Sequence, residues 1–142
     1  MSWRGWRTVS ESAEVHDYLV ALARNVEGIT SKLPATVHAT VGIRHGAVYT
    51  EVRGPRWGTF TLVQGSEAPE TVYDGQYIHH HLIGEGMEDQ LEHTQDTLDE
   101  IVDFLLSDRI LTEGTSRILR RRYLSMPLAD GDEWRFRWFN PR

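Results

Sequence analysis

The stretch from residue 85 to residue 108, EGMEDQLEHTQDTLDEIVDFLLSD, constrains the fold of this chain more than any other segment. Its apolar residues recur at steps of three, four and seven, which is the pattern of an amphipathic helix; they are Met87, Leu91, Leu98, Ile101, Val102 and Leu105. The same stretch contains no Lys or Arg but nine carboxylates: Glu85, Glu88, Asp89, Glu92, Asp96, Asp99, Glu100, Asp103 and Asp108. The pattern therefore predicts a helix with one apolar stripe that faces the core and one dense negative face.

The spacing of these acids works against the stability of the helix that carries them. Like charges stand four residues apart at Glu88 and Glu92, at Glu92 and Asp96, and at Asp96 and Glu100. Each such pair destabilises a helix by about 0.2–0.5 kcal/mol. A row of charges is most often only a solvated face. Its density here, with no interspersed base, favours a surface that meets positive charge, either elsewhere in the chain or on a partner.

A second amphipathic helix is expected near the N-terminus. Its apolar face is formed by Val15, Tyr18, Leu19, Leu22, Ala23 and Val26. Ser10 or Ser12 can cap its start, and Gly28 is a natural stop. We expect Trp3 and Trp6 to pack back against the fold, with an exposed anchor for a partner as the alternative.

After Pro34 the apolar period changes from that of a helix to two, which indicates β-strands. The links are short and contain turn residues such as His45-Gly46, so the strands should pair antiparallel. The expected strands cover residues 36–43, 48–53, 59–64, 71–83, 117–126 and 134–139, with a helix as the weaker reading of 117–126. Asp74-Gly75 marks either a bulge or a tight turn within 71–83. Residues 127–133 should join the last two strands as a hairpin.

These elements predict a single α+β domain over residues 1–142, in which an antiparallel sheet of about six strands is covered on one face by two helices. Core candidates on the strands are Val37, Val41, Phe60, Leu62, Ile78 and Phe136. The chain has no cysteine, which excludes disulfides and thiolate chemistry. The sequence shows no secretory signal, so we expect a cytoplasmic protein.

Charge is distributed unevenly along the chain, which has a net charge of −6. Residues 1–84 carry seven bases and eight acids, residues 85–108 carry only acids, and residues 109–142 carry eight bases and four acids. Proteins that bind nucleic acid mainly through its phosphates are normally basic, so nucleic acid is disfavoured as a partner. No apolar run reaches the ~18–20 residues of a membrane span, so we expect no membrane partner. The acidic field favours a cationic partner instead.

The histidine run at residues 79–81 is the most conspicuous chemical feature. On a strand, His79 and His81 point to one side and His80 to the other. His79 and His81 could share a metal ion, with a third ligand from His93, Asp96 or Glu100 on the following helix. The alternative is that all three are polar strand residues whose pKa values are raised by the nearby carboxylates.

Sequence patterns of the common catalytic sites are missing. The chain contains no Gly-x-Ser-x-Gly elbow, no Walker-type loop and no dinucleotide-binding glycine motif. A solvent-facing row of carboxylates is also not a buried acid–base pair. We therefore expect a protein that is not an enzyme, with no catalytic residues and no cofactor.

Arginines and aromatic residues alternate near the C-terminus. They are Arg117, Arg120, Arg121, Arg122, Arg135 and Arg137, with Tyr123, Trp134, Phe136 and Trp138. Such a surface on a sheet can bind single-stranded nucleic acid by stacking and phosphate contacts. We favour the alternative, in which the arginines pair with the acidic helix of the same molecule and the aromatics are core.

The chain resembles bacterial immunity proteins, the antidotes of contact-dependent and other polymorphic toxin systems. The resemblance is carried by its size, the strand region GTFTLVQGS…ETVYDGQYI and the helix EDQLEHTQDTLDEIVDF. It implies a non-enzymatic protein that binds and neutralises one cognate toxin domain, often a basic nuclease. The contact residues would then be Glu88, Glu92, Asp96, Asp99, Glu100 and Asp103, although the sheet or the loops could equally serve. Two other functions stay open: a metal-dependent hydrolase using His79 and His81, and a secretion-chaperone-like module that holds an effector on its sheet.

Overall fold

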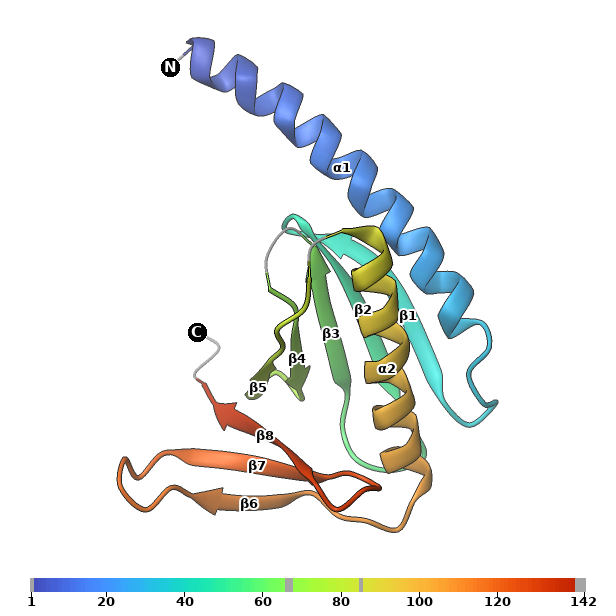
Figure 1. Ribbon diagram of the computed structural model, residues 1–142, viewed down its shortest axis with the longest axis vertical. Helices are drawn as coiled ribbons and strands as arrows, with labels where there is room; N and C mark the ends of the chain where they lie inside the picture. Colours follow the sequence, from blue (N-terminus) through green and yellow to red (C-terminus); the bar gives the residue numbers. More distant parts are fainter. Residues whose placement is uncertain (1, 66–67, 85, 140–142) are drawn as a thin grey trace.

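The computed structural model describes residues 2–65, 68–84 and 86–139, with side chains from residue 13 onward. It contains two helices and eight strands that form one antiparallel sheet, which confirms the α+β class (Figure 1). The elements are α1 (Ser2–Thr30), β1 (His38–Arg44), β2 (Ala47–Arg53), β3 (Phe60–Gly65), β4 (Glu70–Tyr73), β5 (Tyr77–His80), α2 (Met87–Leu106), β6 (Thr112–Thr115), β7 (Arg122–Pro127) and β8 (Glu133–Trp138).

The sheet has two strands more than the six expected. Strand order is β1-β2-β3-β4-β5-β8-β7-β6. The extended segment at residues 71–83 is in fact a hairpin, because Asp74 and Gly75 both adopt positive φ, 53° and 70°, and form a tight turn between β4 and β5. The second extra strand, β6, is a short edge strand whose residues lack alternating apolar character. The expected strand at 117–126 begins only at Arg122, and the residues before it form the β6–β7 turn.

Helix α1 begins earlier and ends later than its caps predict, since it covers Ser2–Thr30 rather than stopping at Gly28. Most of its predicted apolar face is buried: Leu19, Leu22, Ala23 and Val26. Val15, which was placed on that face, is exposed. The side chains of Trp3 and Trp6 lie outside the described residues, so their expected packing stays a prediction.

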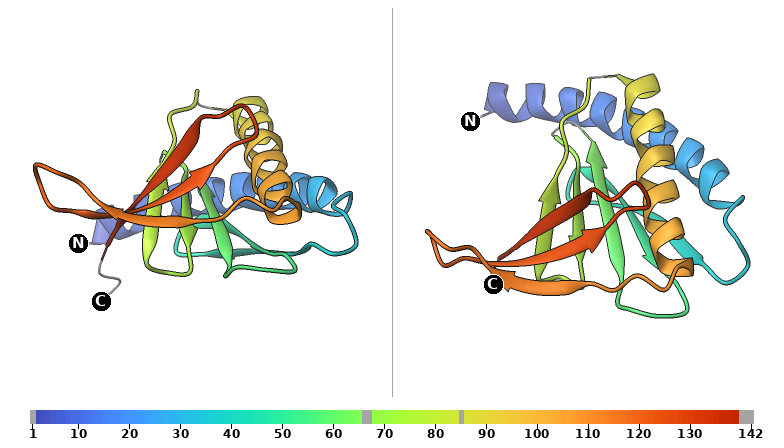
Figure 2. Two further views of the ribbon diagram at one scale, coloured as in Figure 1. Left: turned by 90° about the horizontal axis from the view of Figure 1, so that it is seen from below. Right: turned by 60° about the horizontal axis from the view of Figure 1, so that its bottom comes forward.

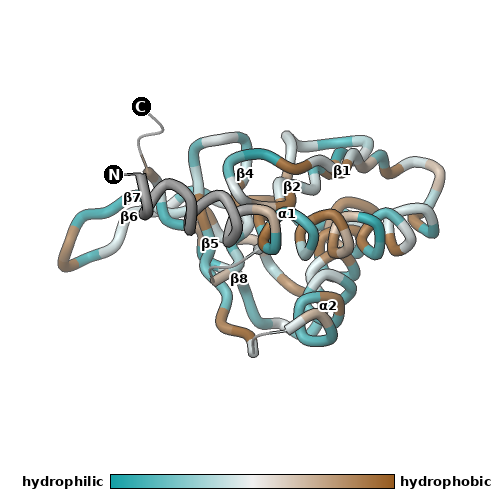
Figure 3. The backbone as a smooth tube through the Cα atoms, turned by 90° about the horizontal axis from the view of Figure 1, so that it is seen from above, coloured by the Kyte–Doolittle hydropathy of each residue, from teal (hydrophilic) through white to brown (hydrophobic). Residues whose placement is uncertain are grey.

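Both helices cover the same face of the sheet, as Figure 3 shows for the layer formed by β1 and β2. Buried and more exposed residues alternate along β2 and β3, and the buried ones form the face that the helices cover. Val48 and Val52 on β2 and Phe60 and Leu62 on β3 are fully buried. Helix α1 packs against Val48, whereas α2 packs against Val52, Phe60 and Leu62. Among the other core candidates, Val37 and Phe136 are buried, but Val41 and Ile78 are only half-buried.

The far end of the sheet bends around the C-terminal half of α2. Strands β8, β7 and β6 cross the lower end of the domain at a steep angle to β1–β3 (Figures 1 and 2). This bend brings Leu124, Met126 and Phe136 into the same core cluster as Phe104 and Leu105 of α2. The expected hairpin at residues 127–133 does join β7 and β8. Neither described helix is long and apolar enough to cross a membrane.

Candidate functional site

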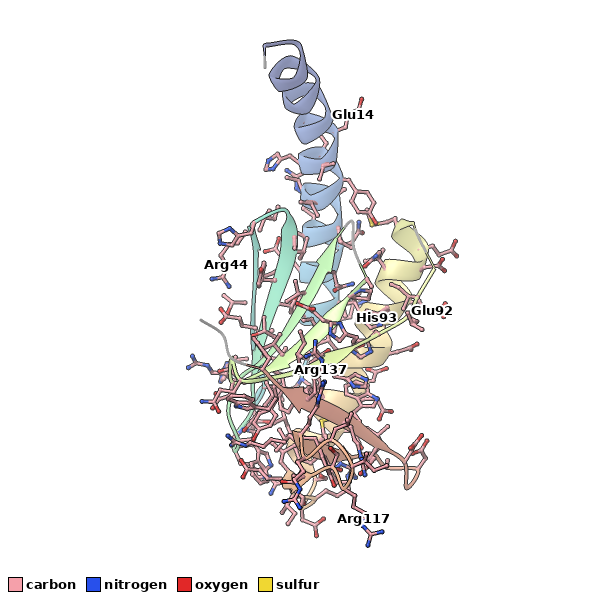
Figure 4. The ribbon with its side chains drawn as sticks, turned by 90° about the vertical axis from the view of Figure 1, so that its left-hand side faces the viewer. Glu14, Arg44, Glu92, His93, Arg117 and Arg137 are labelled. Atoms are coloured by element: carbon pink, nitrogen blue, oxygen red, sulfur yellow. The ribbon has the colours of Figure 1, made fainter. Side chains whose placement is uncertain are left out.

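Helix α2 holds the carboxylates of the candidate site on the side that faces away from the sheet. Glu88, Glu92, Asp96, Asp99 and Asp103 are exposed, and Glu100 is half-buried. Figure 4 shows Glu92 directed outward while its neighbour His93 turns toward the sheet. The predicted separation into a buried face and an acidic face is therefore confirmed for the described part of the helix, which begins after Glu85. We call these six carboxylates the acidic face.

The buried side of α2 is more polar than the predicted stripe. Leu98, Ile101 and Leu105 are buried as expected, but Met87, Leu91 and Val102 are only partly so. Buried positions in the first half of the helix are instead occupied by Gln90, His93, Thr94 and Thr97.

A side-chain amide on β3 explains how polar residues are tolerated there. Gln64 Nε2 donates to the Gln90 carbonyl and to Gln90 Oε1, both at 3.1 Å, and the Thr94 hydroxyl lies 2.9 Å from Gln64 Oε1. Buried polar groups that are hydrogen-bonded in this way escape the penalty for desolvation. The network fixes the rotation of α2 on the sheet, and therefore which carboxylates point outward.

Among the described side chains, the acidic face has almost no counter-charges. Asp103 forms an ion pair with Arg109, which follows α2 in the chain, at 2.6 Å. In the ranges that the structure describes, no other carboxylate of the acidic face lies in a salt bridge. The expected pairing of this helix with the C-terminal arginines is therefore wrong.

The C-terminal arginines have other neighbours. Arg135 bonds Glu133 of its own strand at 2.7 Å and lies over the ring of Tyr123 at 4.2 Å. Arg122 lies over Trp138 at 5.2 Å, and Arg137 approaches His80. Of the aromatics that were expected to be core, Phe136 is buried, Tyr123 and Trp134 are half-buried, and Trp138 is exposed. The bend of the sheet separates this hairpin from the outward side of α2.

Glu100 shows that the negative field extends beyond the helix. Burial raises the pKa of its carboxyl, and the charges of Asp130, Asp103 and Asp99 raise it further, while Arg109 opposes them. Asp130 lies in the turn between β7 and β8, far from α2 in sequence. Sequence reasoning missed this contribution, because only the fold brings the turn to the end of the helix.

Because the charges of the acidic face repel one another, we expect that neutralising one of its carboxylates makes the protein more stable. Glu92→Gln removes two repulsions and keeps helix propensity, so we expect the free energy of unfolding to rise by about 0.4–1 kcal/mol at low salt. Urea denaturation measures the change, and added salt should reduce it. The control is Glu27→Gln, an exposed position on α1, which should give no gain. A loss of stability in Glu92→Gln would mean that an unseen base already compensates this carboxylate.

The three histidines of the alternative metal site do come together. The rings of His79 and His81 are 4.7 Å apart, and those of His81 and His93 are 4.6 Å apart. His79 also stacks on Trp134 at 5.4 Å. As predicted, His79 and His81 share one side of the strand, whereas His80 is exposed and faces Glu70.

The rings pack against one another rather than pointing their nitrogens at a common point. Nδ1 of His79 lies 2.8 Å from the Arg135 carbonyl oxygen, and Nε2 of His81 lies 2.8 Å from the Thr71 hydroxyl. Among the described residues no group of three His, Asp or Glu side chains is arranged to hold a metal ion. The geometry therefore does not support a metal site at His79, His81 and His93.

For His81, the expectation that nearby carboxylates raise the pKa of the histidine run is wrong. Burial, together with the neighbouring His93, His79 and His80, lowers the pKa of the His81 imidazole to about 3. Burial likewise lowers the pKa of His93, although Asp96 acts in the opposite direction. Both rings are therefore neutral at pH 7, and they behave as a packed junction between β5, α2 and β8.

Comparison with known proteins adds no relative: no family model, no curated protein and no solved structure matches this chain. The acidic face and the histidine junction are therefore interpreted from their own geometry.

Proposed function

We propose that the chain is a non-enzymatic binding protein that neutralises a cationic protein domain, in the manner of a bacterial immunity protein. The observation that carries the proposal is the acidic face of α2, which is exposed except at Glu100 and, apart from Asp103, without an ion pair in the described chain. Repulsion between its charges works against stability. A cationic partner would offset this repulsion and would be attracted to the acidic face, so we expect fast, salt-sensitive association.

The neighbouring turn enlarges the surface offered to such a partner. Asp130 adds its charge to that of Glu100, Asp103 and Asp99, so the negative field continues from the helix onto the β7–β8 turn. The Gln64–Gln90 hydrogen bonds hold α2 in one orientation on the sheet. A preorganised face loses less conformational freedom on binding than a mobile one.

The two alternatives gain less from the geometry. The histidine rings pack edge to face instead of directing their nitrogens at one point, so the geometry gives a metal-dependent hydrolase no support. An effector-holding module would need exposed apolar surface on the sheet. The exposed large apolar side chains of the described residues instead lie on α1, on loops, at the end of α2 and at the end of β8: Val15, Trp57, Leu82, Leu106, Ile110, Ile118, Leu119 and Trp138.

The test begins with the product of the gene next to the one that encodes this chain. We expect that product to arrest bacterial growth, and co-expression of the chain to restore it. Association of the two purified proteins is then followed by stopped-flow fluorescence at low and high salt. Reversing Glu92 and Asp96 to lysine should slow association by at least about tenfold at low salt, because electrostatic steering is lost.

The control is a charge reversal elsewhere, compared with the single reversals Glu92→Lys and Asp96→Lys, each of which changes the charge by the same amount. Glu51 is exposed on β2, on the sheet face opposite the helices, so Glu51→Lys should leave the association rate unchanged. Equal rates for wild type and the Glu92→Lys/Asp96→Lys variant would exclude the acidic face as the binding surface. A neighbouring gene product that leaves growth unaffected would remove the immunity function itself.

A further inference from the structure

The turn between β6 and β7 holds two aliphatic side chains out in water. Ile118 is 91% exposed and Leu119 is 67% exposed, although both are large and apolar. Both views of Figure 2 show this end of the hairpin projecting beyond the rest of the domain, and Figure 3 shows its apolar apex. We call residues 116–122 the hairpin tip.

Backbone hydrogen bonds keep the hairpin tip closed. Ser116 N donates to the Arg121 carbonyl at 2.8 Å, and Arg120 N donates to the Ser116 carbonyl at 3.0 Å. Arg121 N also donates to the Ser116 hydroxyl at 3.0 Å. The apex is therefore a formed turn that presents its apolar pair outward.

Four arginines surround this apolar pair: Arg117, Arg120, Arg121 and Arg122, all exposed. The sequence contains no Asp or Glu between Glu113 and Asp130, and Glu113 accepts a hydrogen bond from Tyr77 at 3.1 Å. Figure 4 shows Arg117 extending away from the domain. Trp138, which Arg122 covers, is a further exposed aromatic beside the tip.

We propose that the hairpin tip is an interfacial anchor that inserts Ile118 and Leu119 into an anionic lipid surface while its arginines bind the phosphate headgroups. An apolar apex within a ring of bases matches the layered chemistry of such a surface, where acyl chains lie beneath negative headgroups. Single-stranded nucleic acid fits less well, because bases stack on aromatic rings and the most exposed side chains here are aliphatic.

The position of the acidic face is compatible with a domain that contacts the lipid surface through its hairpin tip. Helix α2 and the hairpin tip lie on opposite sides of the domain (Figure 1). With the tip against an anionic surface, α2 and its carboxylates lie on the far side of the domain from the headgroups, which would otherwise repel them. From the sequence we expected no membrane partner, because no apolar run is long enough to span a membrane. A contact with the lipid surface needs no spanning segment. The anchor is independent of the proposed immunity function, and either can hold without the other.

Co-sedimentation with vesicles tests the anchor. We expect the protein to bind vesicles of phosphatidylglycerol and phosphatidylcholine in equal parts, to ignore pure phosphatidylcholine, and to be released by salt. Arg117→Gln/Arg121→Gln should weaken binding about fivefold for each arginine removed. Ile118→Ser/Leu119→Ser should weaken it by at least about tenfold, because the apolar insertion is lost at unchanged charge.

The control carries the same change in charge at a distance from the tip. Arg24 on α1 and Lys32 after it are exposed, so Arg24→Gln/Lys32→Gln should bind vesicles as wild type does. Circular dichroism establishes that all variants are folded. Equal binding of the serine variant and wild type would overturn the proposal, as would a failure of the wild type to bind anionic vesicles. Tight binding of a single-stranded oligouridine that depends on the arginines but not on Ile118 and Leu119 would assign the tip to RNA instead.

Discussion

Phe60→Ala is expected to lower the free energy of unfolding by about 3–5 kcal/mol, which is the cost typical of emptying a buried phenylalanine site. Phe60 is fully buried on β3. Its ring lies 4.8 Å from that of Tyr73, 6.5 Å from that of Phe104 and 6.2 Å from that of Phe136. Three parts of the fold therefore meet at this side chain, and a domain stable by ~5–15 kcal/mol would lose much of its stability.

Equilibrium urea denaturation of matched variants checks this expectation. Phe60→Leu keeps most of the buried volume and should cost less than Phe60→Ala. Trp138→Ala removes an aromatic that is 40% exposed at the end of β8 and should cost about 1 kcal/mol or less. A loss below about 1.5 kcal/mol in Phe60→Ala would mean that the core can collapse around the missing ring.

A double-mutant cycle tests whether the contact between the rings of Phe60 and Phe136 stabilises the packing of the bent end of the sheet. Phe60→Leu and Phe136→Leu should be non-additive by about 0.5–1.5 kcal/mol, since the two rings are in edge contact. Additive effects would show that β8 docks on α2 independently of β3.

Local periodicity predicts the elements of this fold that are strongly patterned. The helical spacing around Leu98 and Ile101 and the two-residue alternation around Val48 and Phe60 each determine an element and its buried face. Strand β6 escapes this reasoning because Thr112–Thr115 has no apolar alternation and is ordered by pairing with β7. An edge strand of this kind depends on its neighbour rather than on its own sequence.

The candidate site shows where sequence reasoning reaches its limit. The acids of α2 are readable from spacing, whereas Gln90 and Thr94 look like surface residues until Gln64, on β3, comes within hydrogen-bonding distance. The expected pairing of α2 with the C-terminal arginines fails for a related reason. Opposite charges attract, but the bend of the sheet decides the distance between them, and Arg109 rather than the hairpin reaches Asp103.

Acidification from pH 7 to pH 5 is expected to destabilise the protein through its buried histidines. The pKa of His81 is lowered to about 3 in the folded state, mainly by burial, whereas an unfolded histidine titrates near 6.5. Between these two values the unfolded chain binds a proton that the folded chain does not. Stability therefore falls as the pH drops below about 6.5, by up to ~1.4 kcal/mol per pH unit for this residue.

The groups that surround His81 also favour its neutral form, and therefore a loss of stability as the pH falls. His81 packs against His79 on its own side of the strand and against His93 across the junction, and His80 is its neighbour in sequence; the charges of all three oppose its protonation. Asp96 is the neighbouring carboxylate on α2, and it raises the pKa of His93 without overcoming the effect of burial. His93 should thus add to the loss. The hydrogen bond to Thr71 and the contact with Trp134 keep His81 in this position.

Urea denaturation at intervals between pH 7.5 and pH 5 measures the effect above the range in which most carboxylates titrate. His81 alone accounts for a loss of about 2 kcal/mol at pH 5. His81→Gln keeps a polar group near Thr71 but cannot be protonated, so its stability should depend less steeply on pH. His38→Gln, at an exposed position on β1, should follow the wild-type curve. Parallel curves for His81→Gln and wild type would show that His81 accepts its proton in the folded state, so that the junction of β5, α2 and β8 would have to open to water without unfolding the domain.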